Sequence, residues 1–280
     1  MNLAQRIMMA RRMGNSVCED MPLPIGYGIP GPGCGQYDPV TDTGYYGEVA
    51  AADLITGDAL ASLIGLTAGS SQYSNAGWFK FYVGPAAACN RNNNGYAYVA
   101  YVAKMPNRLS ISWDQINAVN AVYGNRREPI LGMNCQVRLI TGAEADPTDY
   151  PANNTSCLDD AGINSEWNEL FYRIHEAVPD CSDVTIGMEG GQSTTLHGGP
   201  QNAGPNWMEF SNAETGVSAP IHGSASWAQE SNGSLRCWRG YYGVASRFFE
   251  GANTNVWYGW RPVLQPTSLD PDSDPYDFSV

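Results

Sequence analysis

Three short segments in the middle of the chain strongly limit the folds that it can adopt. Residues 78–83, 96–104 and 135–140 are rich in β-branched and aromatic residues and are bounded by Gly, Asn or Pro, a pattern typical of strands. Segments with helical spacing lie between and after them, and no βαβ repeat connects the two kinds of element. From residue 185 onward Gly, Ser, Asn and Trp are frequent, which favours long loops on short strands. The sequence therefore predicts an α+β fold rather than a doubly wound sheet.

Three helices are expected around these strands. Residues 50–65 place Leu and Ile at helical spacing, with Gly57 as a point where the helix can break. Residues 112–122 begin with Ser-Trp-Asp-Gln, the pattern of a capping box. Another capped helix is expected to begin at Asn164 or Ser165, which precede apolar residues at helical spacing.

The beginning of the chain favours an attachment arm. Residues 1–14 place apolar residues on one helical face, and both a docking or oligomerisation helix and a frayed terminus remain open for them. Residues 22–47 are dense in Pro and Gly, which remove ladder hydrogen bonds and favour turns and extended chain. We therefore expect a helix and Pro/Gly-rich extended arm in residues 1–48, an α+β domain in residues 49–267 and an acidic tail in residues 268–280.

The chain is strongly acidic. Its 15 Lys and Arg against 28 Asp and Glu give a net charge of −13 and a pI near 4.5, which repels phosphate backbones and anionic lipid surfaces. No run reaches the roughly 20 apolar residues of a membrane-spanning helix, because the best window, residues 49–69, contains two Asp. The amino terminus lacks the apolar run of a signal sequence. We therefore expect no nucleic-acid partner, no membrane insertion and no secretion.

The seven cysteines are scattered, with no pair in Cys-x-x-Cys spacing. This argues against a zinc ribbon or a thioredoxin-type motif. Buried free thiols and disulfides formed outside a reducing compartment both remain open. For disulfides, Cys18 and Cys34 in the Gly- and Pro-rich segment are the candidates for a link between chains.

Known motifs for catalysis and metal binding are missing. The sequence has no P-loop, no strand-borne Gly-x-Gly-x-x-Gly, no His-Glu-x-x-His and no Gly-x-Ser-x-Gly. Asp270, Asp272 and Asp274 alternate like the start of a calcium loop, but Pro275 stands where an EF-hand needs Gly. We therefore expect no metal, no cofactor and no catalytic residue, and we expect His175 on a helix face without a catalytic role.

Two carbohydrate-related hypotheses remain. Glycoside hydrolysis needs paired carboxylates, whose separation depends on the fold; the acidic residues considered are Glu166, Glu176, Glu189 and Glu209. Aromatic side chains in polar loops favour sugar stacking, because a Trp or Tyr face covers the apolar side of a pyranose. The candidate ligand-binding or interface aromatics are Trp207, Trp227, Trp238, Tyr241, Tyr242 and Trp257. The alternative for each Trp is to anchor the core.

The last third of the chain carries motifs of a known family. They are HGSASW at 222–227, LRCWR at 235–239 followed by Arg247, and YGWRPVL at 258–264. These resemble the closing motifs of the C-type-lectin-like fold, in the branch shared by sulfatase-modifying factors and phage diversity-generating adhesins. The resemblance implies a C-type-lectin-like domain in which Gly259 allows a close backbone approach, Trp260 fills the core and Arg261 satisfies loop carbonyls with its forked donors.

The sequence signatures of the family's enzymatic and sugar-binding activities are incomplete. Sulfatase-modifying enzymes use a pair of cysteines near this end, and here only Cys237 is available. The Glu-Pro-Asn and Gln-Pro-Asp signatures of calcium-dependent sugar binding are matched only in part, at 128–130 and 265–267. We therefore expect neither oxidase chemistry nor calcium-dependent sugar binding.

A second resemblance covers the middle of the chain. Its segments are 77–81, 102–104, 111–114, 122–124, 137–143 and 165–170. Their succession resembles that in virion structural proteins of tailed bacteriophages, which often close with the same GWRPVL. The resemblance implies a tail, baseplate, collar or fibre protein, located in the virion, that forms a homo-oligomer and contacts other virion proteins.

Three roles follow from the two resemblances. The leading one is a structural element, because no sugar-binding signature is present. The second is a dedicated receptor-binding adhesin, whose loops between residues 190 and 255 bind a glycan or protein of the host surface. The third is an enzyme of the sulfatase-modifying or glycan-hydrolysing kind.

Overall fold

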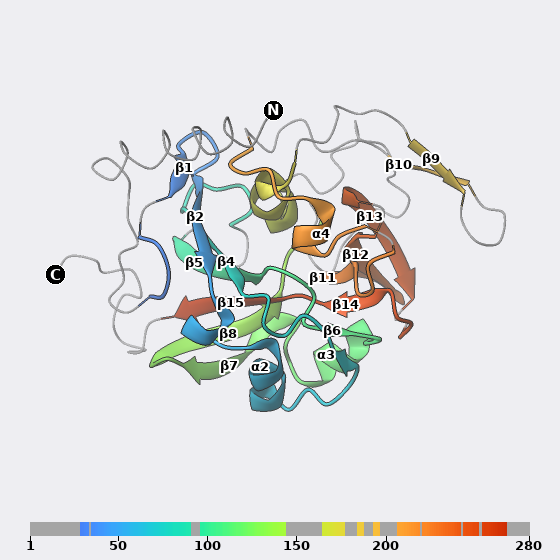
Figure 1. Ribbon diagram of the computed structural model, residues 1–280, viewed down its shortest axis with the longest axis horizontal. Coiled ribbons are helices and arrows are strands. Elements are labelled where there is room, and N and C mark those ends of the chain that lie inside the picture. Colours follow the sequence, from blue (N-terminus) through green and yellow to red (C-terminus); the bar gives the residue numbers. More distant parts are fainter. Residues whose placement is uncertain are drawn as a thin grey trace.

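Two curled β-sheets meet at the segment around Arg261 in the computed structural model (Figure 1). The structure describes residues 29–33, 35–90, 96–143, 164–176, 184–187, 193–196, 206–218, 220–241, 243–251 and 254–267. Several expectations fall outside these residues, namely those for Cys18, Cys34, Glu189, Tyr242, residues 1–14 and residues 268–280.

The first sheet contains seven antiparallel strands in the order β1-β2-β4-β5-β15-β8-β7. They are β1 (Gln36–Asp38), β2 (Thr43–Val49), β4 (Trp78–Val83), β5 (Tyr98–Ala103), β7 (Tyr123–Ile130), β8 (Met133–Leu139) and β15 (Pro262–Thr267). The strand latest in sequence, β15, lies in the middle of the sheet between β5 and β8. The closing motif of the chain is therefore part of the centre of the sheet.

The second sheet has the order β13-β12-β11-β14-β6-β3. Its strands are β3 (Ser70–Ser71), β6 (Arg108–Leu109), β11 (Ala225–Asn232), β12 (Leu235–Gly240), β13 (Gly243–Gly251) and β14 (Tyr258–Trp260). β11 and β14 are parallel, and the other pairs are antiparallel. β9 (Val184–Gly187) and β10 (Ser193–Leu196) form a separate antiparallel hairpin. Because β14 directly precedes β15, the chain passes from the second sheet to the first at Arg261.

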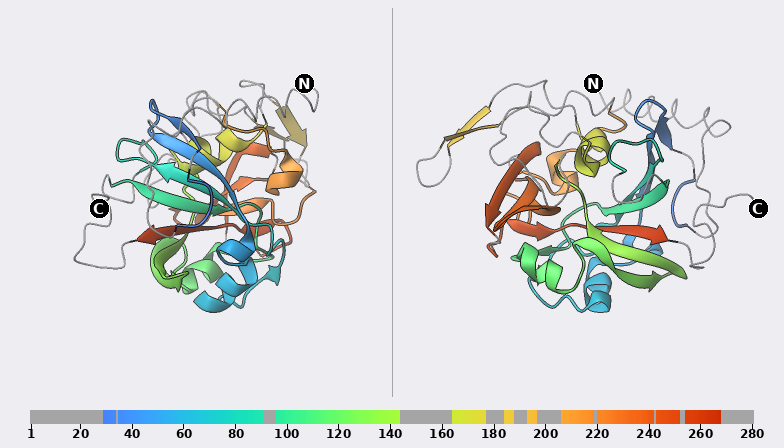
Figure 2. Two further views of the ribbon diagram at one scale, coloured as in Figure 1. Left: turned by 60° about the vertical axis from the view of Figure 1, so that its left-hand side comes forward. Right: turned by 180° about the vertical axis from the view of Figure 1, so that it is seen from behind.

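The helical segments are short. They are η1 (Ala51–Asp53), α2 (Gly57–Ile64), α3 (Trp113–Ala118), the π-helical turn η2 (Trp167–Phe171), η3 (Tyr172–Ile174) and α4 (Asn212–Thr215). α2 and α3 share a core with one face of the first sheet, and η2 and η3 share a core with the other (Figure 2). In the described part of the chain, no helix is long and apolar enough to cross a membrane.

Strands β4 and β5 are buried on both faces, which is why their sequences predict strands so clearly. Every residue of both strands is buried. Trp78 and Tyr101 belong to the core that contains α2 and α3, whereas Phe79 and Phe81 belong to the core that contains η2. Alternate residues of a strand point to opposite faces, so a strand between two cores is apolar throughout. The coarse prediction of an α+β fold is confirmed.

The helix expected at residues 50–65 breaks, as the glycine suggested. Helix α2 begins at Gly57, where Thr56 caps it by accepting a hydrogen bond from the N–H of Ala59. A side chain at Gly57 would meet Asn107, whose Cγ would lie 2.5 Å from the added Cβ. The glycine therefore lets the start of α2 lie against the segment before β6.

The other two expected helices are shorter than predicted. The capping box at Ser112 is confirmed, but α3 ends at Ala118 because Asn120 adopts a left-handed φ of 60° and the chain turns toward β7. The helix expected after Ser165 forms only a π-helical turn and a 3-10 turn. All residues of these two turns are buried, so tertiary packing rather than amphipathic spacing sets their form.

Two stretches differ from the expected organisation. An extended arm was expected up to residue 48, but β1 and most of β2 lie in this stretch. Both strands pair into the first sheet, because Tyr45, Tyr46 and Val49 are buried against it. After residue 185, where short strands were expected, β11, β12 and β13 have eight, six and nine residues. In β11 and β12, burial of Trp227 and Trp238 offsets the low strand propensity of Gly and Asn.

Candidate functional site

Arg261 lies at the junction of the two sheets and is completely buried. Its guanidinium donates hydrogen bonds to the carbonyl oxygens of Ala103 at 2.9 Å, Lys104 at 2.6 Å and Thr215 at 2.6 Å. No described carboxylate forms an ion pair with it, and burial lowers its pKa to about 9. Arg261 therefore ties β5 and α4 to the closing motif through backbone carbonyls.

The two residues before Arg261 are equally confined. A Cβ on Gly259 would lie 2.2 Å from the carbonyl oxygen of Gly223, so only glycine fits between these two backbones. Trp260 is fully buried in the core shared by α2, α3 and both sheets. The geometry of all three motif residues is that of fold-forming residues rather than of an exposed site.

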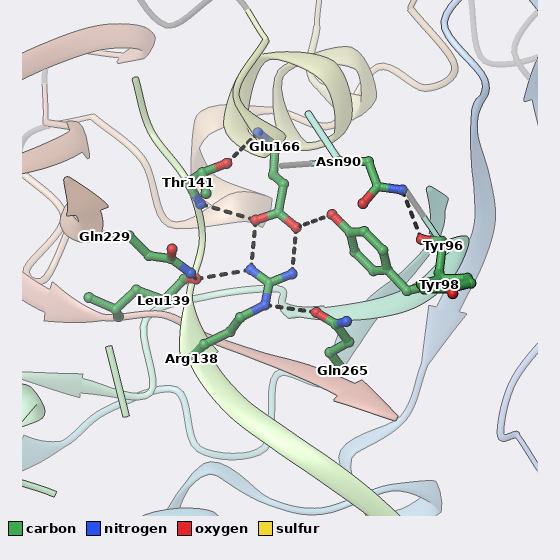
Figure 3. A network of polar contacts seen from close by, with 9 residues as sticks. All are labelled: Asn90, Tyr96, Tyr98, Arg138, Leu139, Thr141, Glu166, Gln229 and Gln265. Carbon is green, nitrogen blue, oxygen red and sulfur yellow. Dashed lines mark hydrogen bonds and ion pairs between the residues drawn. The ribbon is translucent and has the colours of Figure 1, made fainter. Parts of the chain in front are cut away.

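A second buried polar network surrounds Glu166, which precedes η2 (Figure 3). Arg138 of β8 forms a bidentate pair with its carboxylate, at 2.7 Å and 2.5 Å. The hydroxyl of Tyr98 donates to the same carboxylate at 2.7 Å, and the N–H of Thr141 donates at 3.1 Å. Gln265 of β15 accepts a hydrogen bond from the Nε of Arg138. The network therefore connects β5, β8 and β15 to η2.

This network determines the protonation state of the Glu166 carboxylate. Burial alone would raise the pKa of Glu166, but the Arg138 guanidinium and the hydrogen-bond donors outweigh it and hold the pKa below its ordinary value. Its side chain is 2% exposed and remains an ion-paired anion. Glu176 and Glu209, also considered for hydrolysis, are exposed. The structure thus gives Glu166 a stabilising contact network in place of a substrate-facing position.

Trp207 is separate from the other candidate aromatics. It is buried in the core that contains η2, and the Arg173 guanidinium carbon lies 3.8 Å from its ring centroid. Arg173 in turn pairs with Asp38 at 2.8 Å and donates to Thr43 at 3.0 Å. Trp207 therefore anchors the core and does not reach a surface.

Four of the candidate aromatics come together in one series of ring contacts, which we call the aromatic ladder. Its members, from the core outward, are Trp227, Tyr258, Trp238, Tyr241, Trp257 and His222. The inner pair stacks with centroids 4.7 Å apart and an interplanar angle of 12°. Every later contact is edge-to-face, with centroids 5.2–6.4 Å apart and interplanar angles of 64–87°.

Burial decreases along the aromatic ladder. Trp227 is fully buried and donates through its indole N–H to the carbonyl of Ile111 at 2.7 Å, and Trp238 is 5% exposed. Tyr241 and Trp257 are half-buried, and His222 is exposed. The inner rings are core anchors, whereas the last three, which we call the outer rings, form the candidate functional site.

Backbone hydrogen bonds fix the loops that carry the outer rings. The N–H of Gly223 donates to the carbonyl of Val256 at 2.8 Å, and the N–H of Ala225 donates to the carbonyl of Trp257 at 2.9 Å. Asn255 accepts a hydrogen bond from the N–H of Trp257 at 2.9 Å. Gly240, with a φ of 96°, turns the chain after β12 into Tyr241. The segments that carry His222 and Trp257 therefore brace each other, and Tyr241 is placed by the turn at the end of β12.

The described cysteines are buried. They are Cys89, Cys135 and Cys237. Cys237, the residue on which an oxidase would depend, is completely buried beside Ala143 and Ala228. Burial raises the pKa of Cys135 to about 12. Among the described residues, no group of three or more His, Cys, Asp or Glu is arranged to hold a metal ion.

Sequence reasoning did not assign His222 and Tyr258 to the aromatic group. Both stand inside the quoted closing motifs, but only the parallel pairing of β11 with β14 brings them beside the tryptophans. The pairing of Arg138 with Glu166 was also missed, because the two residues are 28 positions apart and belong to different elements. A local pattern in the sequence carries no signal for either contact.

Comparisons with known proteins give no relative from which a role can be transferred. Neither a family model nor a curated protein nor a solved structure matches the chain. The class that the fold defines is a mixed α+β protein built mostly from two β-sheets. Any proposal about its function therefore depends on the sequence motifs and on the geometry described above.

Proposed function

We propose that this protein is a structural component of a tailed-phage virion, as a tail, baseplate, collar or fibre protein, and that residues 49–267 are a C-type-lectin-like domain. The observation that carries the proposal is the geometry of the closing motif. Gly259, Trp260 and Arg261 join both sheets, and the strand that follows occupies the middle of the first sheet. This is the fold-forming role that the family resemblance assigns to the same three residues.

The amino-terminal side of the domain supports an attachment role. Tyr101 donates a hydrogen bond to the carbonyl of Pro30 at 3.0 Å, and Lys80 donates to the carbonyl of Pro32 at 3.1 Å. Lys80 is 4% exposed, and burial lowers its pKa to about 8. An arm that links a domain to a particle needs a firm anchor on the domain, and residues 29–33 provide one.

The partners of the proposed component are other virion proteins and further copies of the same chain, since particle parts repeat by symmetry. The test is quantitative mass spectrometry of particles purified by density gradient from the source of the sequence. We expect peptides of this chain at a fixed number of copies per particle. Purified particles that contain no peptide of the chain, while every known virion protein is detected, would contradict the proposal.

The outer rings favour a second candidate function, that of a receptor-binding adhesin. Half-exposed aromatic side chains on a braced surface are common in binding sites. Purified protein added in excess should then reduce adsorption of the particles to host cells. Unchanged adsorption, with folded protein in excess over receptors, would leave the structural role as the only one of the two.

A further inference from the structure

The outer rings are prearranged for a flat ligand. Trp257 has two edge-to-face partners, with His222 at 5.2 Å and Tyr241 at 5.6 Å between centroids. Tyr241 in turn contacts Trp238, which is part of the core. A ring fixed in this way loses little conformational entropy when a ligand stacks on it.

The surroundings of the outer rings are polar. Thr254, Asn255 and His222 are exposed, and among the described residues of these loops Val256, at 39% exposure, is the one exposed large aliphatic side chain. A ligand site with a few aromatic residues and a polar rim suits a molecule that has one apolar face and many hydroxyl groups. A pyranose has this character.

The size of the site separates a sugar from a protein partner. A stable protein interface buries about 800 Å² on each partner, which exceeds what three side chains provide. Val40 and Leu131, the two most exposed large hydrophobic residues of the described chain, lie in the turns after β1 and between β7 and β8 rather than in the loops of the outer rings.

The charge near the site selects among sugars. The hydroxyl of Tyr258, the second ring of the aromatic ladder, donates to the exposed carboxylate of Glu250. The chain as a whole carries a net charge of −13. Acidic sugars would be repelled by this field, whereas neutral ones would not.

We propose that the outer rings, Tyr241, Trp257 and His222, form a binding site for a neutral hexose polymer, with Trp257 as the stacking platform. The site needs no metal ion, which distinguishes it from calcium-dependent lectin sites. The proposal rests on the proposed function, because a domain displayed on a particle would meet such polymers on a host surface. Its test uses the purified full chain, so its failure leaves the presence of the chain in particles unaffected.

The first experiment is isothermal titration calorimetry with four hexamers, in the presence of a chelator. The neutral probes are maltohexaose, cellohexaose and chitohexaose, and the acidic probe is hexagalacturonate. We expect at least one neutral probe to bind in the micromolar to millimolar range, and the acidic probe to bind at least about tenfold more weakly. No binding of any neutral probe at millimolar concentration would overturn the proposal.

Variants locate the site. Trp257→Ala should weaken binding of the neutral probe by about tenfold or more, and Trp257→Phe should retain part of it. The matched control is Tyr96→Ala, since Tyr96 is an aromatic residue with 53% exposure outside the aromatic ladder. Tyr96→Ala should bind like the wild type. Equal binding by wild type and folded Trp257→Ala would contradict the assignment.

A measurement on the unchanged protein covers the case in which Trp257→Ala fails to fold. Oxidation of tryptophan by N-bromosuccinimide, read by peptide mass spectrometry, reports the accessibility of each indole. The bound hexamer should protect Trp257 selectively and leave the oxidation of buried Trp207 and Trp227 unchanged. Protection of a different tryptophan, or of none, would overturn the proposal.

Discussion

Arg138 and Glu166 form a bidentate ion pair with 3% and 2% of their side chains exposed. Arg173 and Asp38 form a second pair, which spans 135 positions of the sequence. Removing one partner of a buried pair leaves the other charge without compensation, which is far more costly than losing a pair at the surface. At the scale of single residues, these pairs are the contacts most sensitive to substitution.

Glu166→Gln should therefore destabilise the protein severely. The change keeps the shape of the side chain but leaves the Arg138 guanidinium buried without a negative partner. We expect the free energy of unfolding to fall by about 3–5 kcal/mol, measured by urea denaturation. Glu48→Gln is the control, since Glu48 pairs with Lys104 at a surface position with 45% exposure and should cost about 1 kcal/mol or less. Similar losses in both variants would contradict this account.

His175 should make stability depend on pH in a distinct window. It is 1% exposed, and burial lowers its pKa from 6.5 to about 4, although the backbone of Glu176 acts in the opposite direction. The charged groups that act on it are Arg261, which lowers the pKa, and Glu214, which raises it. Between pH 6.5 and about 4, His175 binds more protons in the unfolded state than in the folded state. The contribution of His175 to stability is therefore complete above pH 6.5 and falls as the pH drops toward 4.

The expected loss across that window is about 3 kcal/mol, from the size of the pKa shift. Denaturation of the wild type and of His175→Leu at a series of pH values measures it. The variant should lack the loss that begins below pH 6.5, whereas the losses that begin below about pH 4.5 and 3.8, where unfolded Glu166 and Asp38 take up protons, should remain in both proteins. Parallel curves for both proteins across the upper window would rule out His175 as the cause.

At the scale of elements, the β7–β8 hairpin has an unfavourable turn. Its two-residue loop places Leu131 at a φ of 50° and Gly132 at a φ of 79°, between the paired Ile130 and Met133. Leucine is poorly suited to this left-handed conformation, and Leu131 is also 60% exposed. Asparagine and glycine are the residues that such turns prefer.

Leu131→Asn should accordingly stabilise the protein by about 0.5–1 kcal/mol, because Asn tolerates the left-handed conformation. Thermal unfolding followed by circular dichroism would show the gain. Leu131→Ala is the matched control, since it removes the exposed side chain but keeps the backbone penalty. If Leu131→Asn is no more stable than Leu131→Ala, the turn is not strained.

Gly259, the middle residue of β14, should not tolerate any side chain. Gly259→Ala would place a methyl group 2.2 Å from the Gly223 carbonyl oxygen, so the strand must shift. We expect a loss of about 1–3 kcal/mol in the free energy of unfolding. Gly251→Ala, at the end of β13 with no atom within 4 Å of the added Cβ, should change it by about 0.5 kcal/mol or less. Equal effects in the two variants would show that the close approach is unimportant.

Elements were predictable from the sequence where both their faces are buried. β4 was predicted with its exact bounds because a strand between two cores is apolar throughout. β7 was missed because it lies at the edge of the sheet and carries Arg126, Arg127 and Glu128, which local propensity assigns to loops. Helix α3 had a readable start at Ser112, but its end depends on the turn at Asn120 and on contacts with distant residues.

At the scale of the whole molecule, the last described strand completes the first sheet. β15 pairs with β5 and β8, so the first sheet is complete only when the closing motif is in place. The closing motifs predicted the fold-forming roles of Gly259, Trp260 and Arg261, but they predicted neither the strand order nor the aromatic ladder. The strand order depends on pairings between segments more than 100 positions apart, such as Val263 with Val102, and the aromatic ladder depends on the parallel pairing of β11 with β14.

The central claim is that this chain is part of a tailed-phage virion. Immunogold electron microscopy, with an antibody to the folded domain on particles purified from the source, tests it most directly. The account predicts label at one fixed structure, where a tail tip or fibre favours the adhesin role and a collar or tail shaft favours the purely structural one. Particles without label, from a preparation in which the antibody recognises the purified chain, would contradict the account.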